Sequence, residues 1–198
     1  MGLGAAVAVF NDASTVSAGI ANNAVVDSAA AIDIDAVTRQ TINVVAPQVT
    51  SGAGAIGASF TKVSVGNPAA DETRAYIGND AQIGQGSATV GGLDMNAEST
   101  IDATGEAFGV SVGAIAGSMN FSFVDVTPTV KAEIGASADV KTSGNVTVEA
   151  KTHMDVDSQV LGVAIGGLGA IVASVAHATL TPTVIAGFGA STIVNSTG

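Results

Sequence analysis

The sequence predicts an all-β fold, a repeat β-solenoid (parallel β-helix), and three observations predict it. Short apolar motifs recur roughly every 50 to 60 residues, about three and a half times, which is typical of stacked repeat arrays. Within each repeat, apolar and polar residues alternate with the period of two that indicates a strand. Glycine is frequent, with 25 residues, and aromatic residues make up only 4% of the chain, so we expect a thin core.

The repeat divides the chain into units that cover residues 2–51, 52–111, 112–166 and 167–198. Each unit opens on small residues, and these openings are Gly4-Ala5-Ala6, Gly54-Ala55-Ile56, Gly113-Ala114-Ile115 and Gly169-Ala170-Ile171. Because the repeat continues from end to end, we expect a single elongated domain. Both ends are repeat sequence, and we expect the chain to be an excised segment of a longer protein.

Aligning the units predicts three columns of apolar residues, since each coil of a solenoid buries its side chains against the same positions of the next coil. The first predicted column is Phe10, Phe60, Met119 and Val175. The second is Ile20, Ile77, Ile134 and Phe188, and the third is Ile34, Met95 and Val148. These columns are structural, and no catalytic, cofactor-binding or metal-binding residues are predicted.

The strand arrangement within a unit is left open by the sequence. A unit is long enough for one broad coil or for two ordinary ones, and Gly166-Gly167 between two apolar runs also predicts some antiparallel pairing. Residues 160–176 form an uncharged run, and the length of this run is near the short limit for a membrane-spanning helix. Their glycine content, and the polar Ser111, Ser118 and Asn120 in the equivalent segment, favour strands and predict no membrane insertion of this segment.

The charge balance excludes some classes of partner. Six basic residues against 17 acidic ones give a net charge of −11, so nucleic acid and anionic lipid headgroups would be repelled. The chain has no cysteine, which excludes a disulfide scaffold and a thiolate metal site.

Two pairs of aspartates are candidates for a catalytic site. Asp33 with Asp35, and Asp155 with Asp157, place two carboxylates on one face of a strand, as a carbohydrate-active β-helix lyase or hydrolase would need. A solvated strand face explains the same pattern, and Arg39 is a cation close in sequence to the first pair. No calcium-binding motif is present, so Ca²⁺ would bind only adventitiously between acidic strands, and we expect no cofactor.

Two further features receive structural interpretations. The histidines are His153, expected on a solvated strand, and His177, expected as a partly buried spacer in the position of Phe121. The motif Thr127-Pro128-Thr129 recurs at residues 181–183 and raises ice binding as a minor alternative, which the prolines disfavour because a flat central strand does not accommodate them.

A longer cadence resembles a known family. It reads Ala75-Tyr76-Ile77-Gly78-Asn79-Asp80-Ala81-Gln82-Ile83 and recurs over residues 132–140, each followed by a strand-like run at 93–97 and 144–150. This cadence resembles the β-strand repeats of very large bacterial surface and secreted adhesins, the filamentous haemagglutinin-like and leukotoxin-like exoproteins. The first unit departs from it, with Asn22-Asn23 where later units have a glycine.

The resemblance implies a non-enzymatic, extracellular segment at the bacterial cell surface. It transfers no catalytic residue, because the repeats of that family are scaffold. We therefore expect a rigid spacer or a self-associating shaft, whose partners are neighbouring repeats or copies of itself end to end, with a host or cell-surface ligand as a further partner.

Overall fold

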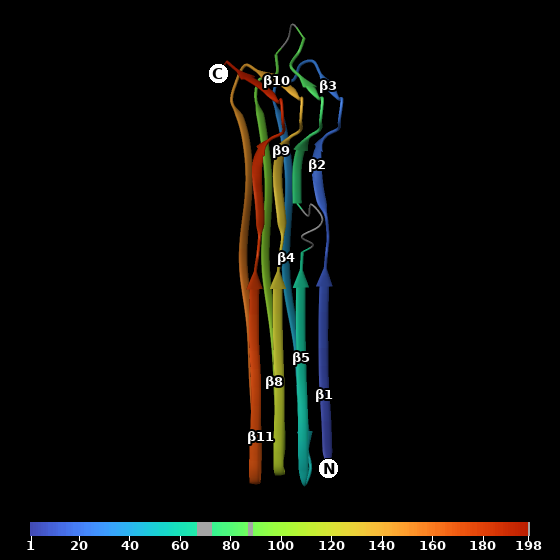
Figure 1. Cartoon of the computed structure of the whole chain (residues 1–198), viewed down its shortest axis with the longest axis vertical. Helices are drawn as coiled ribbons and strands as arrows, with labels where there is room; N and C mark the ends of the chain where they lie inside the picture. Colours follow the sequence, from blue (N-terminus) through green and yellow to red (C-terminus); the bar gives the residue numbers. More distant parts are fainter. Residues whose placement is uncertain (67–72, 87–88, 198) are drawn as a thin grey trace.

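The computed structural model describes residues 1–66, 73–86 and 89–197, and every regular element in these ranges is a β-strand (Figure 1). The all-β prediction is therefore confirmed. Residues 67–72 and 87–88 of the predicted second unit, and residue 198 of the last, lie outside the described residues. Across the described ranges, no helix has the length and apolar character needed to cross a membrane.

The chain follows one path repeatedly, and we call each traverse a pass. A pass runs along a first leg, crosses the upper end of Figure 1 through a short strand, and comes back along a return leg. The first legs contain β1 (Gly2–Asp12) and β2 (Val16–Ile20), β5 (Gly54–Val65) and β6 (Thr73–Ile77), β9 (Thr129–Ile134), and β12 (Thr183–Phe188). The short strands are β3 (Val25–Val26), β7 (Gln82–Ile83), β10 (Asp139–Thr142) and β13 (Ile193–Ser196).

The return legs connect one pass to the next. The first is β4 (Ile32–Ser51), and the others are the first parts of β8 (Leu93–Val126) and β11 (Val146–Leu180). The second parts of β8 and β11 lead into the following first legs, as the pairing shows: β8 pairs with β4 through residues 93–112 and with β5 through residues 115–126. Each sequence repeat thus corresponds to one pass along a first leg and a return leg.

Every ladder between the described strands is parallel. Gly2 lies opposite Ala55, and Ile32 lies opposite Leu93, so equivalent residues are one repeat apart in sequence. The antiparallel pairing predicted at Gly166-Gly167 is wrong. At this point β11 turns between its two legs, with a register shift between Gly166 and Gly169.

First and return legs lie against each other as two thin layers. Ser122 Oγ donates to the carbonyl of Gly105 at 2.8 Å, and Thr61 Oγ1 donates to the carbonyl of Glu106 at 2.8 Å. Both bonds join the second part of β8, or β5, to the first part of β8. Strand β8 therefore folds back on itself, and its two halves belong to opposite layers.

The second and third predicted columns coincide with the observed register. Strand pairing places Ile20, Ile77, Ile134 and Phe188 opposite one another, and likewise Ile34, Met95 and Val148. Ile77, Ile134 and Met95 are fully buried and belong to one apolar cluster between the upper parts of the two legs. A second cluster lies below it and contains Val63, Val65, Ile101, Val124 and Val126.

The first predicted column is wrong. Phe60 lies opposite Phe121, and Phe121 opposite Val175, but Phe10 lies opposite Val63 and Met119 opposite Ala58. The cause is a difference in the length of the turns. Gly54 at the start of β5 lies opposite Ile115 in β8, and Ile115 lies opposite Gly169 in β11, so these three residues are the equivalent starting points. Gly113 therefore belongs to the turn, and Gly4 pairs with Gly57 instead of Gly54. The observed column is Val7, Phe60, Phe121 and Val175.

This column also points away from the interior. We define the lower end as residues 2–11, 44–62, 107–124 and 158–180, at the bottom of Figure 1. Here the buried residues are small or polar except for Val124 at the upper margin, and they include Gln48, Ser59, Ser118, Asn120 and Ser122. Several large apolar residues of the same strands are exposed, among them Leu3, Val7, Ile56, Ile115 and Met119. The lower end is thus polar inside and apolar outside.

Close approach of the two layers explains this inversion. A Cβ added to Gly109 would lie 2.1 Å from Asn120 Oδ1, and one added to Gly162 would lie 2.4 Å from Asn120 Nδ2. The space accepts small side chains that bond to one another: Ser59 Oγ donates to Asn120 Oδ1 at 2.7 Å, and Asn120 Nδ2 donates to Ser118 Oγ at 3.0 Å. Buried polar groups need such partners, so a thin interior selects serine, threonine and asparagine.

We predict that Gly109→Ala lowers the free energy of unfolding by about 1–3 kcal/mol, the usual cost of overpacking a tight interior. Its methyl group would displace Asn120, whereas Gly117→Ala is a matched control, because an added Cβ on that outward position meets its nearest atom at 3.9 Å. Urea unfolding measures both. Equal stability of the two variants would contradict the close layer contact.

Candidate functional site

The predicted acidic pairs lie on the open outer surface of the return legs. Asp33 lies opposite Asp94, and Asp35 lies opposite Asn96, whose Nδ2 donates to Asp35 Oδ1 at 3.3 Å. A hollow of about 330 Å³ lies beside Asp33 and Asp94, and no basic residue or histidine is among its lining residues. Asp155 lies opposite Asp102 and is exposed, as is Asp157. Each pair therefore faces solvent without an adjacent cation.

The basic residues and histidines near this surface have other contacts. Arg39 lies 3.7 Å from Glu98, and the carboxylate of Glu149, 2.7 Å from Lys151 Nζ, accepts its hydrogen bond and raises the pKa of Lys151. His153 is exposed, as expected. His177 is also exposed, and it lies opposite Phe123 instead of Phe121, so its predicted placement is wrong. In the described ranges no cluster of three or more potential metal ligands is present.

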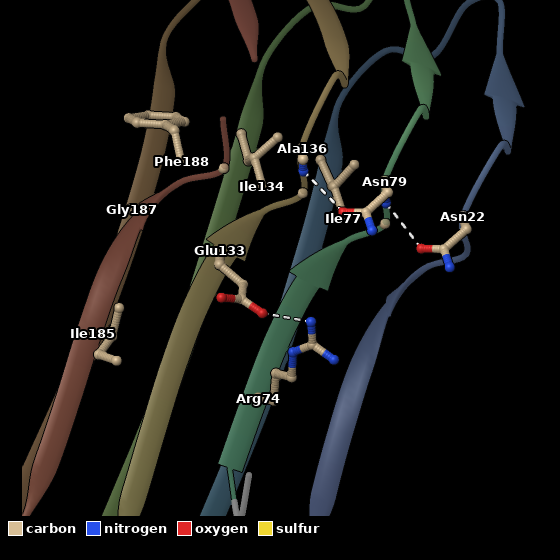
Figure 2. Close-up of a pocket in the computed structure, with 13 residues that line it drawn as sticks. Asn22, Arg74, Ile77, Asn79, Glu133, Ile134, Ala136, Ile185, Gly187 and Phe188 are labelled. Carbon is tan, nitrogen blue, oxygen red and sulfur yellow. Dashed lines mark hydrogen bonds and ion pairs between the residues drawn. The ribbon is translucent and has the colours of Figure 1, made fainter. Parts of the chain in front are cut away.

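A larger hollow lies elsewhere, on the outer side of the upper first legs (Figure 2). Its volume is about 450 Å³. Strands β6, β9 and β12 form its floor, and the turns that follow them form its upper border. The lining residues that matter for its character are Asn22, Arg74, Asn79, Glu133 and Gly187. None of them was predicted as a site residue from the sequence.

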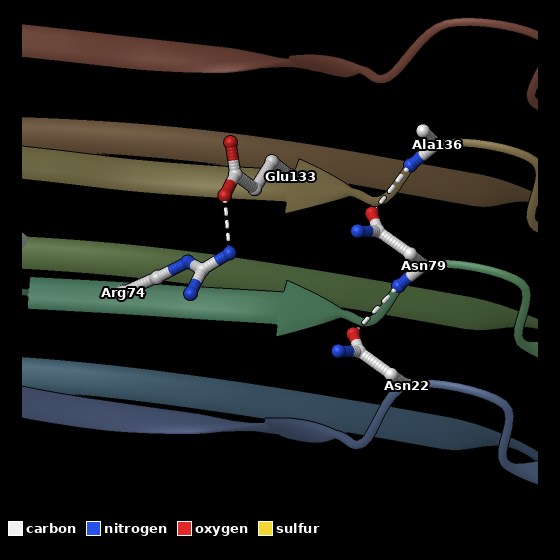
Figure 3. Close-up of polar contacts among 5 residues, drawn as sticks. All are labelled: Asn22, Arg74, Asn79, Glu133 and Ala136. Carbon is white, nitrogen blue, oxygen red and sulfur yellow. Dashed lines mark hydrogen bonds and ion pairs between the residues drawn. The ribbon is translucent and has the colours of Figure 1, made fainter.

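An ion pair crosses the floor of this groove. Arg74 on β6 bonds through Nη2 to Glu133 Oε1 on the adjacent β9, as Figure 3 shows. The guanidinium carbon of Arg74 also lies 4.5 Å from the ring centroid of Tyr76, within range of a cation–π interaction. Tyr76 lies opposite Glu133, and Glu133 opposite Gly187, whose missing side chain opens the groove at that position.

Two asparagines form a ladder along the upper border (Figures 2 and 3). Asn22 Oδ1 accepts a hydrogen bond from the backbone N–H of Asn79 at 2.9 Å, and Asn79 Oδ1 accepts one from the N–H of Ala136 at 2.9 Å. Each side chain thus satisfies a backbone donor in the turn of the next pass. In the third pass the equivalent residue is Ala136, which carries no acceptor, so the side-chain ladder stops there.

The same corner requires glycine and a left-handed residue. An added Cβ on Gly135 would lie 2.6 Å from the backbone N of Asn79, and Gly78 and Gly189 meet the preceding turn as closely. The turns contain residues with positive φ at Asn23, Asp80, Ser137 and Ser191, between 57° and 59°. Asparagine and aspartate tolerate this conformation better than most residues. The corner is therefore built for close stacking of one turn on the next.

The chemistry available in the groove is that of binding and stacking. Its one carboxylate and its one guanidinium bond to each other, and its lining contains no histidine, serine, threonine or lysine. No pair of acids faces across it. The groove therefore offers backbone amides, two asparagine amides and an ion pair, which suit polar contacts and packing.

The sequence carried a signal for this corner that the repeat alignment did not use. Gly78 and Gly135 precede equivalent turns, and Asn22 is the counterpart of Asn79 when Ile20 is placed opposite Ile77. The departure of the first unit, with Asn22-Asn23 in place of a glycine, is thus a difference of one residue, Ala21 for Gly78. No protein-family model, curated protein or solved structure matches the chain.

We predict that Asn79→Ala lowers the free energy of unfolding by about 1 kcal/mol, because the N–H of Ala136 loses its acceptor. Ala136→Asn is expected to raise it by about 0.5–1 kcal/mol, by offering an acceptor to the backbone of the next turn. Thermal or urea unfolding measures both, and Asn43→Ala on the outer surface of β4 is the control. Destabilisation by Ala136→Asn would contradict the ladder.

Proposed function

We propose that the chain is a parallel β-solenoid segment that serves as a non-enzymatic structural shaft of a bacterial extracellular adhesin or surface fibre. The observation that carries the proposal is the parallel pairing of equivalent strands from β1 through β5 and β8 to β11. Successive passes repeat one path, and every pass offers the next pass the same row of backbone groups. Such an array extends in one direction without a change of design.

Stiffness is the first property that the arrangement supports. The return strand β4 pairs over its whole length with β8, and residues 93–112 of β8 pair in turn with β11. The same long strands continue into the opposite layer, so bending one layer strains the other. The Asn22–Asn79–Ala136 ladder and the ion pair between Arg74 and Glu133 add contacts between passes. A rigid spacer needs this resistance to bending.

Open strand edges support end-to-end association. Strands β11, β12 and β13 are the outermost strands of their sheets in the described part of the chain. Thr183 N–H donates to the carbonyl of Pro128, and strand residues alternate in direction, so the N–H of Val184 points to the open edge. The carbonyl of Asn145 accepts a hydrogen bond from the N–H of Leu93. The backbone N–H groups of even-numbered residues of this return leg, such as Val156, therefore also face the open edge. Such edges pair readily with further strands.

The assignment to a surface adhesin rests on the resemblance of the cadence at Ala75–Ile83 and at residues 132–140. In the structure both copies follow the same course, β6 with β7 and β9 with β10, each through a turn with a positive φ. They hold the scaffold together, which agrees with a stalk. The proposed partners are neighbouring repeats or further copies end to end, with a host or cell-surface ligand bound along the shaft.

The two alternative functions receive less support. For a carbohydrate-active enzyme, the pairs Asp33 with Asp35 and Asp155 with Asp157 would need a positioned arginine or lysine, and the hollow beside Asp33 is lined by none. For ice binding, the repeated threonines would need a flat exposed face. Thr129 is buried, and Pro128 lies at the junction of β8 and β9.

We predict that the purified chain forms elongated end-to-end assemblies and that the double variant Val156→Pro, Val184→Pro removes them. Proline deletes an N–H that faces the open edge in each layer and leaves the native ladder bonded. The concentration needed for assembly is expected to rise at least about tenfold. Negative-stain electron microscopy and sedimentation velocity measure the change, with circular dichroism as the check on folding.

The double variant Val156→Ala, Val184→Ala is the matched control, because it removes the same side chains and keeps both edge donors. It should assemble like the unmodified chain. Compact particles of the unmodified chain with no elongated assembly at any concentration would defeat the self-associating form of the proposal.

A further inference from the structure

The lower end carries an apolar outer face on its first legs. The face consists of the outward residues of β1, β5, and the second parts of β8 and β11, which lie side by side in Figure 1. Leu3 and Ile171 at its two sides are 75% and 76% exposed, and Met119 in its middle is 47% exposed. This exposure is unusual for large apolar side chains that share one flat surface.

The face has a relief that fits its own copy. One ridge across the strands is Val7, Phe60, Phe121 and Val175, and another contains Leu3, Ile56 and Ile171 and is interrupted at Gly117 on β8. Between them runs a shallower row of Ala5, Ala58, Met119 and Ala173. Two sheets that pack face to face interdigitate such ridges and valleys across about 10 Å. A two-fold axis would place the ridge of each copy in the valley of the other.

The charged residues are distributed so that electrostatic repulsion between two copies is weak at this face. The net charge of the chain is −11, yet the strands at the level of the lower end contain few charged residues: Lys62 within the four ranges, and Glu106 and Asp125 at their upper margin, opposite Gln159 and Thr179. The acidic residues of the described ranges lie outside these ranges, for example on the return legs at Asp94, Asp102 and Asp155. Repulsion between copies is therefore smallest at the lower end, where the charges of both molecules are farthest away.

The area of the face is sufficient for a specific dimer. Four strands spaced about 4.8 Å apart and nine residues long cover about 600 Å² per copy. Two copies together would bury about 1,200 Å², which reaches the lower limit of stable protein interfaces. The hydrogen-bonded interior behind the face keeps it flat, so little conformational entropy is lost when it pairs.

A lipid bilayer fits the same face less well. Strands β1 and β11 form the two outermost edges of this sheet in the described part of the chain. Unpaired backbone groups cost several kcal/mol each in the hydrocarbon region, and insertion would bury both edges there. Packing two sheets face to face leaves the edges at the sides in contact with water.

We infer that this apolar face is a lateral docking surface for a second copy of the same chain, so that shafts pair side by side. The contact uses side chains of the lower end and does not involve the strand edges proposed for end-to-end association. The inference therefore goes beyond the proposed function, and the two modes of association can fail independently.

The test measures mass in the edge-blocked variant Val156→Pro, Val184→Pro, where end-to-end association is removed. Sedimentation equilibrium is expected to give twice the 19.1 kDa of one chain. Adding Met119→Glu, or Val7→Glu at the more exposed margin of the face, should weaken the dimer at least about tenfold, because a charge is buried at the contact. Val49→Glu is the control, since this exposed apolar residue lies on the return leg of the same end, and it should leave the dimer intact.

Three results would overturn the inference. A single-chain mass at about 100 µM, far above the dissociation constants usual for interfaces of this size, would exclude the dimer. Equal weakening by Val49→Glu would move the contact to another surface. Binding to neutral phosphatidylcholine vesicles that Met119→Glu abolishes would assign the face to lipid. If the proline variant does not fold, the width of the filaments is measured instead. Filaments of the Met119→Glu variant are expected to be half as wide as those of the unmodified chain.

Discussion

Parallel backbone pairing between equivalent residues of successive passes is the interaction on which the rest of the structure depends. Strand β8 is paired on one side with β4 and β5 and on the other with β11, so its backbone bonds belong almost wholly to neighbouring passes. Pairing of this kind forces like positions onto like. A residue that fits the interior in one pass must therefore have a counterpart of similar size in the next, as Ile20, Ile77 and Ile134 do.

Separation between the two layers then decides which residue types fill each level. In the upper half the layers are far enough apart for Ile77, Ile134 and Met95, which pack as an ordinary apolar core. At the lower end Gly109 and Asn120 leave no room for a side chain of that size. Hydrophobic burial is lost there, and hydrogen bonds among Ser59, Ser118 and Asn120 satisfy the buried polar groups instead. The large apolar residues remain on the strands and point outward.

The sequence predicted the all-β class, the repeat and the alternation of side chains, because these follow from spacing alone. It predicted two of three columns, since the isoleucine positions have few competing alignments. It failed on the column of Phe60, because a Gly-Ala-Ile opening was used as the anchor and Gly113 lies in a turn. It also could not show which face was inside, because alternation gives two faces and burial of the polar one needs the layer spacing. The Asn22–Asn79 ladder was missed because a one-residue difference hid the equivalence of the two turns.

Segregation of charge and apolar surface along the strand direction separates the two surfaces that we propose for association. Strand edges at either side of the stack offer backbone donors and acceptors, and they are indifferent to side-chain identity. The outer face of the lower end offers only side chains, and its ridge and valley are specific to this sequence. An edge contact adds length, whereas a face contact adds width. A shaft that used both would become stiffer as it grew, because bending stiffness rises steeply with the thickness of a beam, and the acidic return legs would stay on the outside to keep such paired shafts in solution.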